Sequence, residues 1–175
     1  MTTESSRDVI IRYLQNAIAA ERSFESQLRS FAKIGDQPDV KRLFEQHAEE
    51  TKRQYERLTA RLSALGEKPS TMKSFLAHLF GMAPAAAEFG HEAHEKVVQN
   101  LVIAYSVENS EVAMYEALSV VAAAAGDVET ERLARDIQSE ERATAEKVWS
   151  ALPECARESF YKQTHGRIVG GGGAV

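Results

Sequence analysis

The chain has 175 residues, of which 43% are hydrophobic, and its 21 Lys and Arg residues against 26 Asp and Glu residues give a formal net charge of −5. This acidity argues against a protein that binds nucleic acid or an anionic membrane surface. The length and the hydrophobic content are sufficient for one domain with a buried core, and they exclude disorder throughout the chain. We expect a single domain at residues 1–161, followed by a flexible Gly-rich tail at residues 162–175.

The sequence shows no segment that would place the chain in a membrane or direct it to secretion. The longest nearly apolar run, residues 117–125, is far shorter than the roughly 20 residues that span a bilayer. The N-terminal residues 1–15 lead directly into an amphipathic pattern and contain no apolar core of a signal peptide. We therefore expect a cytoplasmic protein. Cys155 is the only cysteine, so an intramolecular disulfide and a thiolate metal cluster are excluded, and carboxylates, histidines and tyrosines must carry any chemistry.

Four segments have apolar residues at the 3.6-residue period of an α-helix. They are expected at about residues 6–34, 38–65, 92–125 and 128–152. Ser5 with Asp8 three residues later has the spacing of an N-terminal cap, and Pro38 suits a first helical turn. A glycine follows each of the first three segments, and Pro153 follows the fourth, which predicts the helix ends.

A segment rich in helix breakers, residues 66–90, separates the second predicted helix from the third, and it contains a short amphipathic piece at residues 75–80. Even with a short helix inside, it can reach roughly 60 Å, which exceeds the length of ~40 Å helices. Two helical hairpins joined by one long crossover form the ferritin-like arrangement. We therefore predict an all-α, ferritin-like four-helix bundle with a short helix in the crossover.

Each predicted helix has at least one glutamate on its otherwise apolar face. The glutamates and the histidine on these faces are Glu21 in the first helix, His47 and Glu50 in the second, Glu108 and Glu111 in the third, and Glu141 in the fourth. Helical spacing directs these side chains into the bundle. Counted from the two short turns, the glutamates also lie at a similar depth, about 22 Å along their helices.

Several ionised glutamates that face one another in a dry interior would each cost several kcal/mol. Bound cations would remove the repulsion, and carboxylates together with imidazole suit iron or manganese. We therefore predict a dinuclear Fe or Mn site at the six residues just listed, because glutamates from opposite hairpins can bridge two ions. The alternative is a metal-free helical interaction or structural protein, in which the buried acids pair with Arg53, Gln54, Tyr105 and Tyr115.

Four strings of the sequence, at the same positions, resemble the YciE/YciF family of ferritin-like stress proteins. They are AAER around Glu21, HAEET at residues 47–51, VENSEVAMYEAL at residues 107–118 and SEERAT at residues 139–144. The resemblance covers residues 9–152. It implies a ferritin-like bundle with a dinuclear site, a homodimer, and a role in stress.

The sequence departs from a ferritin-type Glu-x-x-His motif at both of the expected histidines. The positions three residues after Glu50 and Glu141 hold Arg53 and Thr144. His47, three residues before Glu50, lies on the same helix face and is expected to act as a substitute ligand. The chemistry that this set predicts is oxidation of Fe(II), or reduction of dioxygen or peroxide, with no nucleic-acid or membrane partner. The family resemblance implies that this chemistry acts in oxidative or general stress.

Overall fold

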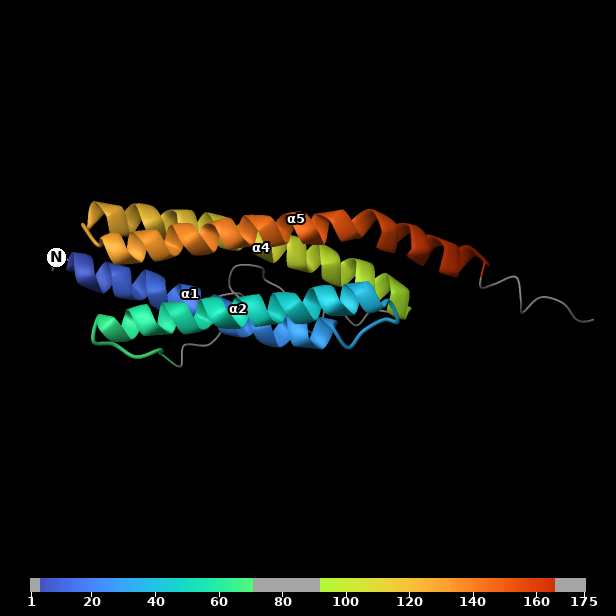
Figure 1. The fold of residues 1–175 in the computed structure, drawn as a ribbon, viewed down its shortest axis with the longest axis horizontal. Helices are drawn as coiled ribbons and strands as arrows, with labels where there is room; N and C mark the ends of the chain where they lie inside the picture. Colours follow the sequence, from blue (N-terminus) through green and yellow to red (C-terminus); the bar gives the residue numbers. More distant parts are fainter. Residues whose placement is uncertain (1–3, 71–91, 166–175) are drawn as a thin grey trace, which may run out of the picture.

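The computed structural model describes residues 4–70 and 92–165, and this part of the chain forms four long α-helices and no strand. The helices are α1 (Ser6–Phe31), α2 (Pro38–Ala64), α4 (Ala93–Ala124) and α5 (Val128–His165). Figure 1 shows α1 and α2 as one antiparallel hairpin and α4 and α5 as a second. None of these helices is long and apolar enough to cross a membrane. The predicted all-α four-helix bundle is confirmed.

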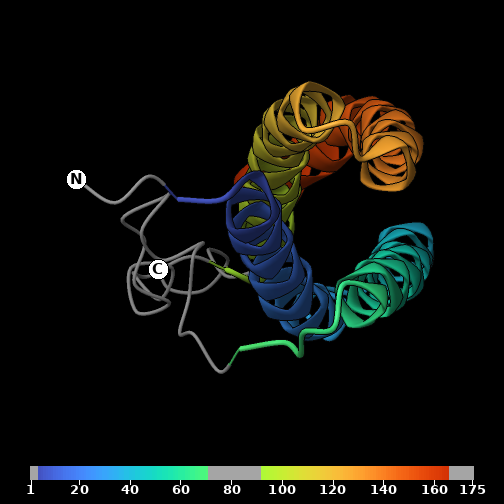
Figure 2. The same cartoon turned by 90° about the vertical axis from the view of Figure 1, so that its left-hand side faces the viewer.

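The two hairpins lie side by side, with α1 next to α4 and α2 next to α5 (Figure 2). The end of α2 and the start of α4 lie at opposite ends of the bundle (Figure 1). These positions are the ones that a long crossover between the two hairpins requires. The short helix expected at residues 75–80 lies outside the described residues.

The turns between paired helices contain the glycines that the sequence placed at helix ends. Gly35 has a φ angle of +82° and Gly126 one of +74°, a conformation that other residues rarely adopt. Gly35 also lies so close to Val97 of α4 that a Cβ atom would overlap the valine side chain. The α1–α2 turn therefore packs directly against the start of the second hairpin.

The prediction that the last helix ends at Leu152 was wrong, because α5 continues through Pro153 to His165. Proline removes one backbone hydrogen bond from a helix interior. Contacts with the rest of the bundle offset this loss, because Lys162 lies 3.0 Å from a carboxylate oxygen of Asp36 and Cys155 is buried. The side chain of Gln163 also hydrogen-bonds Glu95 at 2.6 Å. The first part of the expected tail is thus helical, and residues 166–175 lie outside the described residues.

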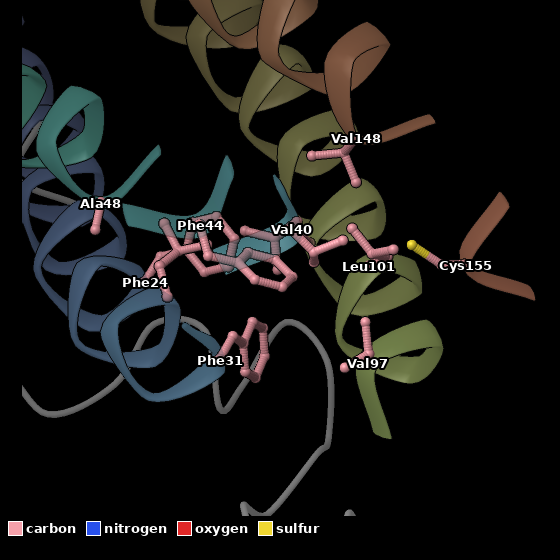
Figure 3. Packing of buried hydrophobic residues seen from close by; sticks show 12 residues of the cluster. Phe24, Phe31, Val40, Phe44, Ala48, Val97, Leu101, Val148 and Cys155 are labelled. Carbon is pink, nitrogen blue, oxygen red and sulfur yellow. The ribbon is translucent and has the colours of Figure 1, made fainter. Parts of the chain in front are cut away.

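The core consists of two apolar clusters. The first apolar cluster, near the α1–α2 turn, includes Phe24, Phe31, Phe44, Leu101 and Val148 and draws on all four helices (Figure 3). The second apolar cluster, toward the other end of the helices, includes Leu14, Leu58, Tyr115, Leu118 and Ile137.

Buried polar side chains occupy the stretch of each helix between these two clusters, and we call them the polar layer. They are Glu21, His47, Thr51, Gln54, Glu108, Glu111, Glu141 and Thr144. On α1, for example, Glu21 lies between Leu14 of the second cluster and Phe24 of the first. The apolar core of the bundle is therefore interrupted at one level by polar groups, whose burial costs free energy unless they have partners.

Candidate metal centre

Five of the six residues predicted to bind metal lie in the polar layer. Glu21, His47, Glu108, Glu111 and Glu141 are each at most 3% exposed to solvent, and together they come from all four helices. The apolar neighbours that precede and follow each of them on its helix face account for this burial. The structure thus brings together side chains that lie up to about 120 residues apart in the sequence.

Glu108, Glu111 and Glu141 form the tightest group of carboxyls. Each offers one carboxylate oxygen, and these three oxygens lie within 4.8 Å of one another. His47 adjoins this group, because its Nε2 atom lies 2.5 Å from Oε1 of Glu108. The His47 ring also packs edge-on against Phe24, with the ring centroids 5.2 Å apart, which holds the imidazole beside the carboxyls.

Glu21 completes the buried set from α1. The hydroxyl of Tyr115, which is fully buried on α4, donates a hydrogen bond to Oε1 of Glu21. The second oxygen of Glu21 has no hydrogen-bond partner among the described residues. Tyr115 therefore fixes the orientation of Glu21 and leaves one of its oxygens available to a ligand.

The buried residues of this site lack most of the hydrogen bonds that they could make. Within the described part of the chain, the unpartnered atoms here are Oε2 of Glu21, both ring nitrogens of His47, both oxygens of Glu108, and Oε1 of Glu111 and of Glu141. The 2.5 Å contact between His47 and Glu108 does not have hydrogen-bond geometry. Native structures leave few buried polar groups unpaired, so this concentration indicates a missing partner.

The electrostatic environment favours neutral side chains in the metal-free protein. Burial raises the pKa of Glu21, Glu111 and Glu141 well above the usual range, and neighbouring carboxylates raise it further. Burial also raises the pKa of Glu108 to about 8. For His47, burial lowers the pKa to about 4, so its imidazole is neutral at pH 7, which is the form that binds metal ions.

Glu50 does not join this buried group, contrary to the prediction from helix periodicity. Its side chain is 32% exposed at the edge of the bundle between α2 and α5. Oε2 of Glu50 accepts a hydrogen bond from the hydroxyl of Thr144 at 3.1 Å, and Oε1 lies 3.2 Å from Nζ of Lys147. Two donors on α5 thus hold Glu50 at the edge of the site.

The pairs expected for a metal-free bundle are mostly absent from the described residues. Arg53 is exposed, and Gln54 donates to Glu140 at 3.2 Å rather than to a buried acid. Tyr105 packs against Trp149, with ring centroids 5.1 Å apart, outside the polar layer. Of the four expected partners, Tyr115 alone contacts a buried glutamate.

Sequence reasoning missed Lys147 and the role of Thr144. Thr144 was noted only as the residue in place of a histidine, yet its hydroxyl binds Glu50. The sequence signal that could have identified them is their spacing. Lys147 follows Thr144 by three residues, so both lie on the same side of α5.

Comparisons with known proteins identify similar chains and folds. A family model described as a domain of unknown function (DUF892) matches residues 5–160. A crystal structure of a Xanthomonas campestris protein is 28% identical with a TM-score of 0.77, and the match covers 91% of this chain and 99% of that one. The Escherichia coli stress protein YciF is 24% identical with a TM-score of 0.77, covering 89% and 99% of the two chains.

A more distant similarity links the chain to ferritins. The Desulfovibrio desulfuricans bacterioferritin, whose structure is described as having a diiron site, is 20% identical with a TM-score of 0.59. The match covers 92% of this chain and 85% of the bacterioferritin chain. The fold is therefore ferritin-like, and the resemblance to the YciE/YciF proteins is confirmed.

The raised pKa values predict that the metal-free protein loses stability as the pH rises from about 6.5 to about 8. In this interval the unfolded chain has ionised its glutamates, whereas the folded protein still holds a proton on Glu108 and on the other carboxyls whose pKa burial raises. Each proton held only by the folded state lowers the free energy of unfolding by ~1.4 kcal/mol per pH unit.

Urea unfolding of chelator-treated protein across this interval measures the effect. The lowered pKa of His47 has the opposite influence, but only below its unfolded value of about 6.5. Glu108→Gln should make the slope shallower. Stability that is constant or increases with pH in the wild type would contradict the protonated state of these carboxyls.

Proposed function

The chain belongs to the DUF892 family and has a ferritin-like fold, and on this basis we propose that it binds two Fe or Mn ions and acts in oxidative or general stress. The observation that carries the proposal is the set of unpartnered nitrogen and oxygen atoms in the polar layer. Carboxylate oxygens with a neutral imidazole are ligands that suit iron and manganese. Cations would also remove the cost of ionising the buried glutamates.

The donor set divides into a compact group and a surrounding one. Glu108, Glu111 and Glu141 would hold one ion, since three of their oxygens already lie within 4.8 Å of one another. Glu21, His47 and Glu50 would complete the coordination, with Glu50 reaching in from the edge. Thr144 and Arg53 cannot replace the histidines of a ferritin-type motif, so the site relies more heavily on carboxylates.

The proposed chemistry is oxidation of Fe(II), with dioxygen or peroxide as the oxidant. Bound reduced ions would supply the electrons for the reduction of the oxidant. The two apolar clusters shield the buried carboxyls from water at both ends of the site. Tyr115 orients Glu21, and the protonated glutamates would release their protons when cations bind.

Thermal melts of the wild type and Glu111→Leu, each with and without Fe(II) or Mn(II) under anaerobic conditions, test metal binding. We expect metal to raise the melting temperature of the wild type, because ligand binding to the native state adds ~2.7 kcal/mol at a hundredfold excess over the dissociation constant. The rise should be smaller in Glu111→Leu. Without metal, this variant should be at least as stable as the wild type, since it removes a buried polar group.

Glu56→Leu is the matched control, because Glu56 is an exposed glutamate in the middle of α2. Its response to metal should equal that of the wild type. Identical wild-type melts with and without metal would overturn the proposal. The buried acids would then be proton-sharing groups of a metal-free structural protein.

Catalysis makes a narrower prediction than binding. Fe(II) oxidation by dioxygen or peroxide should be faster with the protein than in buffer, and Glu108→Gln should remove most of the difference because it removes a central carboxylate. Absorbance in the near ultraviolet follows the reaction. A wild-type progress curve that overlays the buffer control would limit the site to metal binding.

The homodimer implied by the family resemblance is part of the proposal. It is supported by large apolar side chains on the outer face of α4 and α5, where Val102 is 49% exposed and Trp149 58%. A groove on this face is lined by Tyr105, Val112 and Trp149 together with charged and polar side chains of both helices. Light scattering should give about twice the 19.3 kDa mass of one chain, and Trp149→Glu should reduce it. A wild-type mass of one chain would contradict the dimer.

A further inference from the structure

Glu50 is the one predicted ligand, among the six, whose two carboxylate oxygens both have partners in the described part of the chain. Lys147 lies 3.2 Å from Oε1, and the Thr144 hydroxyl donates to Oε2 at 3.1 Å. Both partners come from α5, whereas Glu50 belongs to α2. The contact therefore joins the two hairpins at the edge of the polar layer, and we call these three residues the edge clamp.

The other predicted ligands are buried and, within the described residues, have nitrogen or oxygen atoms without hydrogen-bond partners. Glu108, Glu111 and Glu141 are buried, lie together, and carry unpartnered oxygens. His47, also buried, has two unpartnered ring nitrogens beside them. A first ion could use this group without any rearrangement of the edge clamp. An ion that used Glu50 would have to compete with Lys147 and Thr144 for its oxygens.

We propose that the site fills in order, the first ion at Glu108, Glu111 and Glu141 and the second only when Glu50 leaves the edge clamp. Lys147 is then a positioning residue that sets the affinity for the second ion. The inference rests on the proposed metal-binding function and adds to it an order of loading and the residue that controls it.

The exposure of the edge clamp makes this exchange feasible. The Lys147 side chain is 52% exposed and that of Glu50 is 32% exposed, so the ammonium group can move into water when the carboxylate turns inward. An exposed ion pair shifts an equilibrium by about fivefold or less. A divalent cation near Glu50 is also repelled by Lys147. Loss of the lysine charge should therefore favour binding of the second ion in two ways, because it releases Glu50 and removes this repulsion.

The test is an anaerobic Mn(II) titration of the chelator-treated full chain, in which electron paramagnetic resonance measures free Mn(II). The wild type should bind in two steps of different affinity. Lys147→Met should tighten the second step about fivefold and the first by a smaller factor, because the charge of Lys147 also acts on Glu108. Thr144→Val removes the other contact without a change in charge, and it should tighten the second step by a smaller factor.

Two further variants separate this role from a general effect of charge. Lys162→Met is the matched control, because Lys162 also lies on α5 and pairs with a carboxylate at 3.0 Å, but at Asp36, away from the polar layer. It should leave both steps unchanged. Lys147→Arg keeps the positive charge beside Glu50 and should restore the second step to the wild-type affinity.

The outcomes distinguish this inference from the proposed function. A wild type that binds no Mn(II) or Fe(II) would overturn both. Two ions of equal affinity in the wild type, or a second step that Lys147→Met leaves unchanged or weakens, would overturn the ordered loading and leave the metal site intact. Tightening of the second step in Lys162→Met as well would show that total charge is responsible, and it would also overturn the role of Lys147.

Discussion

The burial of four carboxyl groups at one level between two apolar clusters is the constraint on which the rest of this structure depends. Such groups are tolerated only when they are protonated, hydrogen-bonded or bound to cations. The fold supplies a hydroxyl donor for one oxygen of Glu21 and keeps His47 neutral, but within residues 4–70 and 92–165 most of the other atoms have no hydrogen-bond partner. The described part of the bundle thus encloses carboxyl groups that its own side chains do not satisfy.

The two hairpins contribute unequally to this site. Three carboxyls that lie close together, Glu108, Glu111 and Glu141, come from α4 and α5. The α1–α2 hairpin supplies Glu21 and His47, while its third candidate, Glu50, is held at the edge by groups on α5. The helix periodicity is similar in both hairpins, so this asymmetry arises from the side chains that face each residue across the bundle.

Local patterns in the sequence were sufficient for the helices, their turns and the burial of five of the six candidate residues, because burial of a helix face follows directly from spacing. They were insufficient where a residue far away in the sequence determines the position of a side chain or the end of a helix. The same spacing pointed Glu50 inward, but Lys147 and Thr144 compete for it from another helix. Pro153 is a helix breaker locally, yet contacts such as that of Lys162 with Asp36 stabilise the helix beyond it.

The close approach of the Gly35 turn to Val97 has a consequence for the order of folding. Short turns join the helices within each hairpin, so their pairing closes only short loops and can be fast. Seating the Gly35 turn on α4, by contrast, requires the hairpins to dock, and docking is also the step that withdraws the carboxyls from water. Acidity and dissolved cations would then act on this late association rather than on the formation of either hairpin.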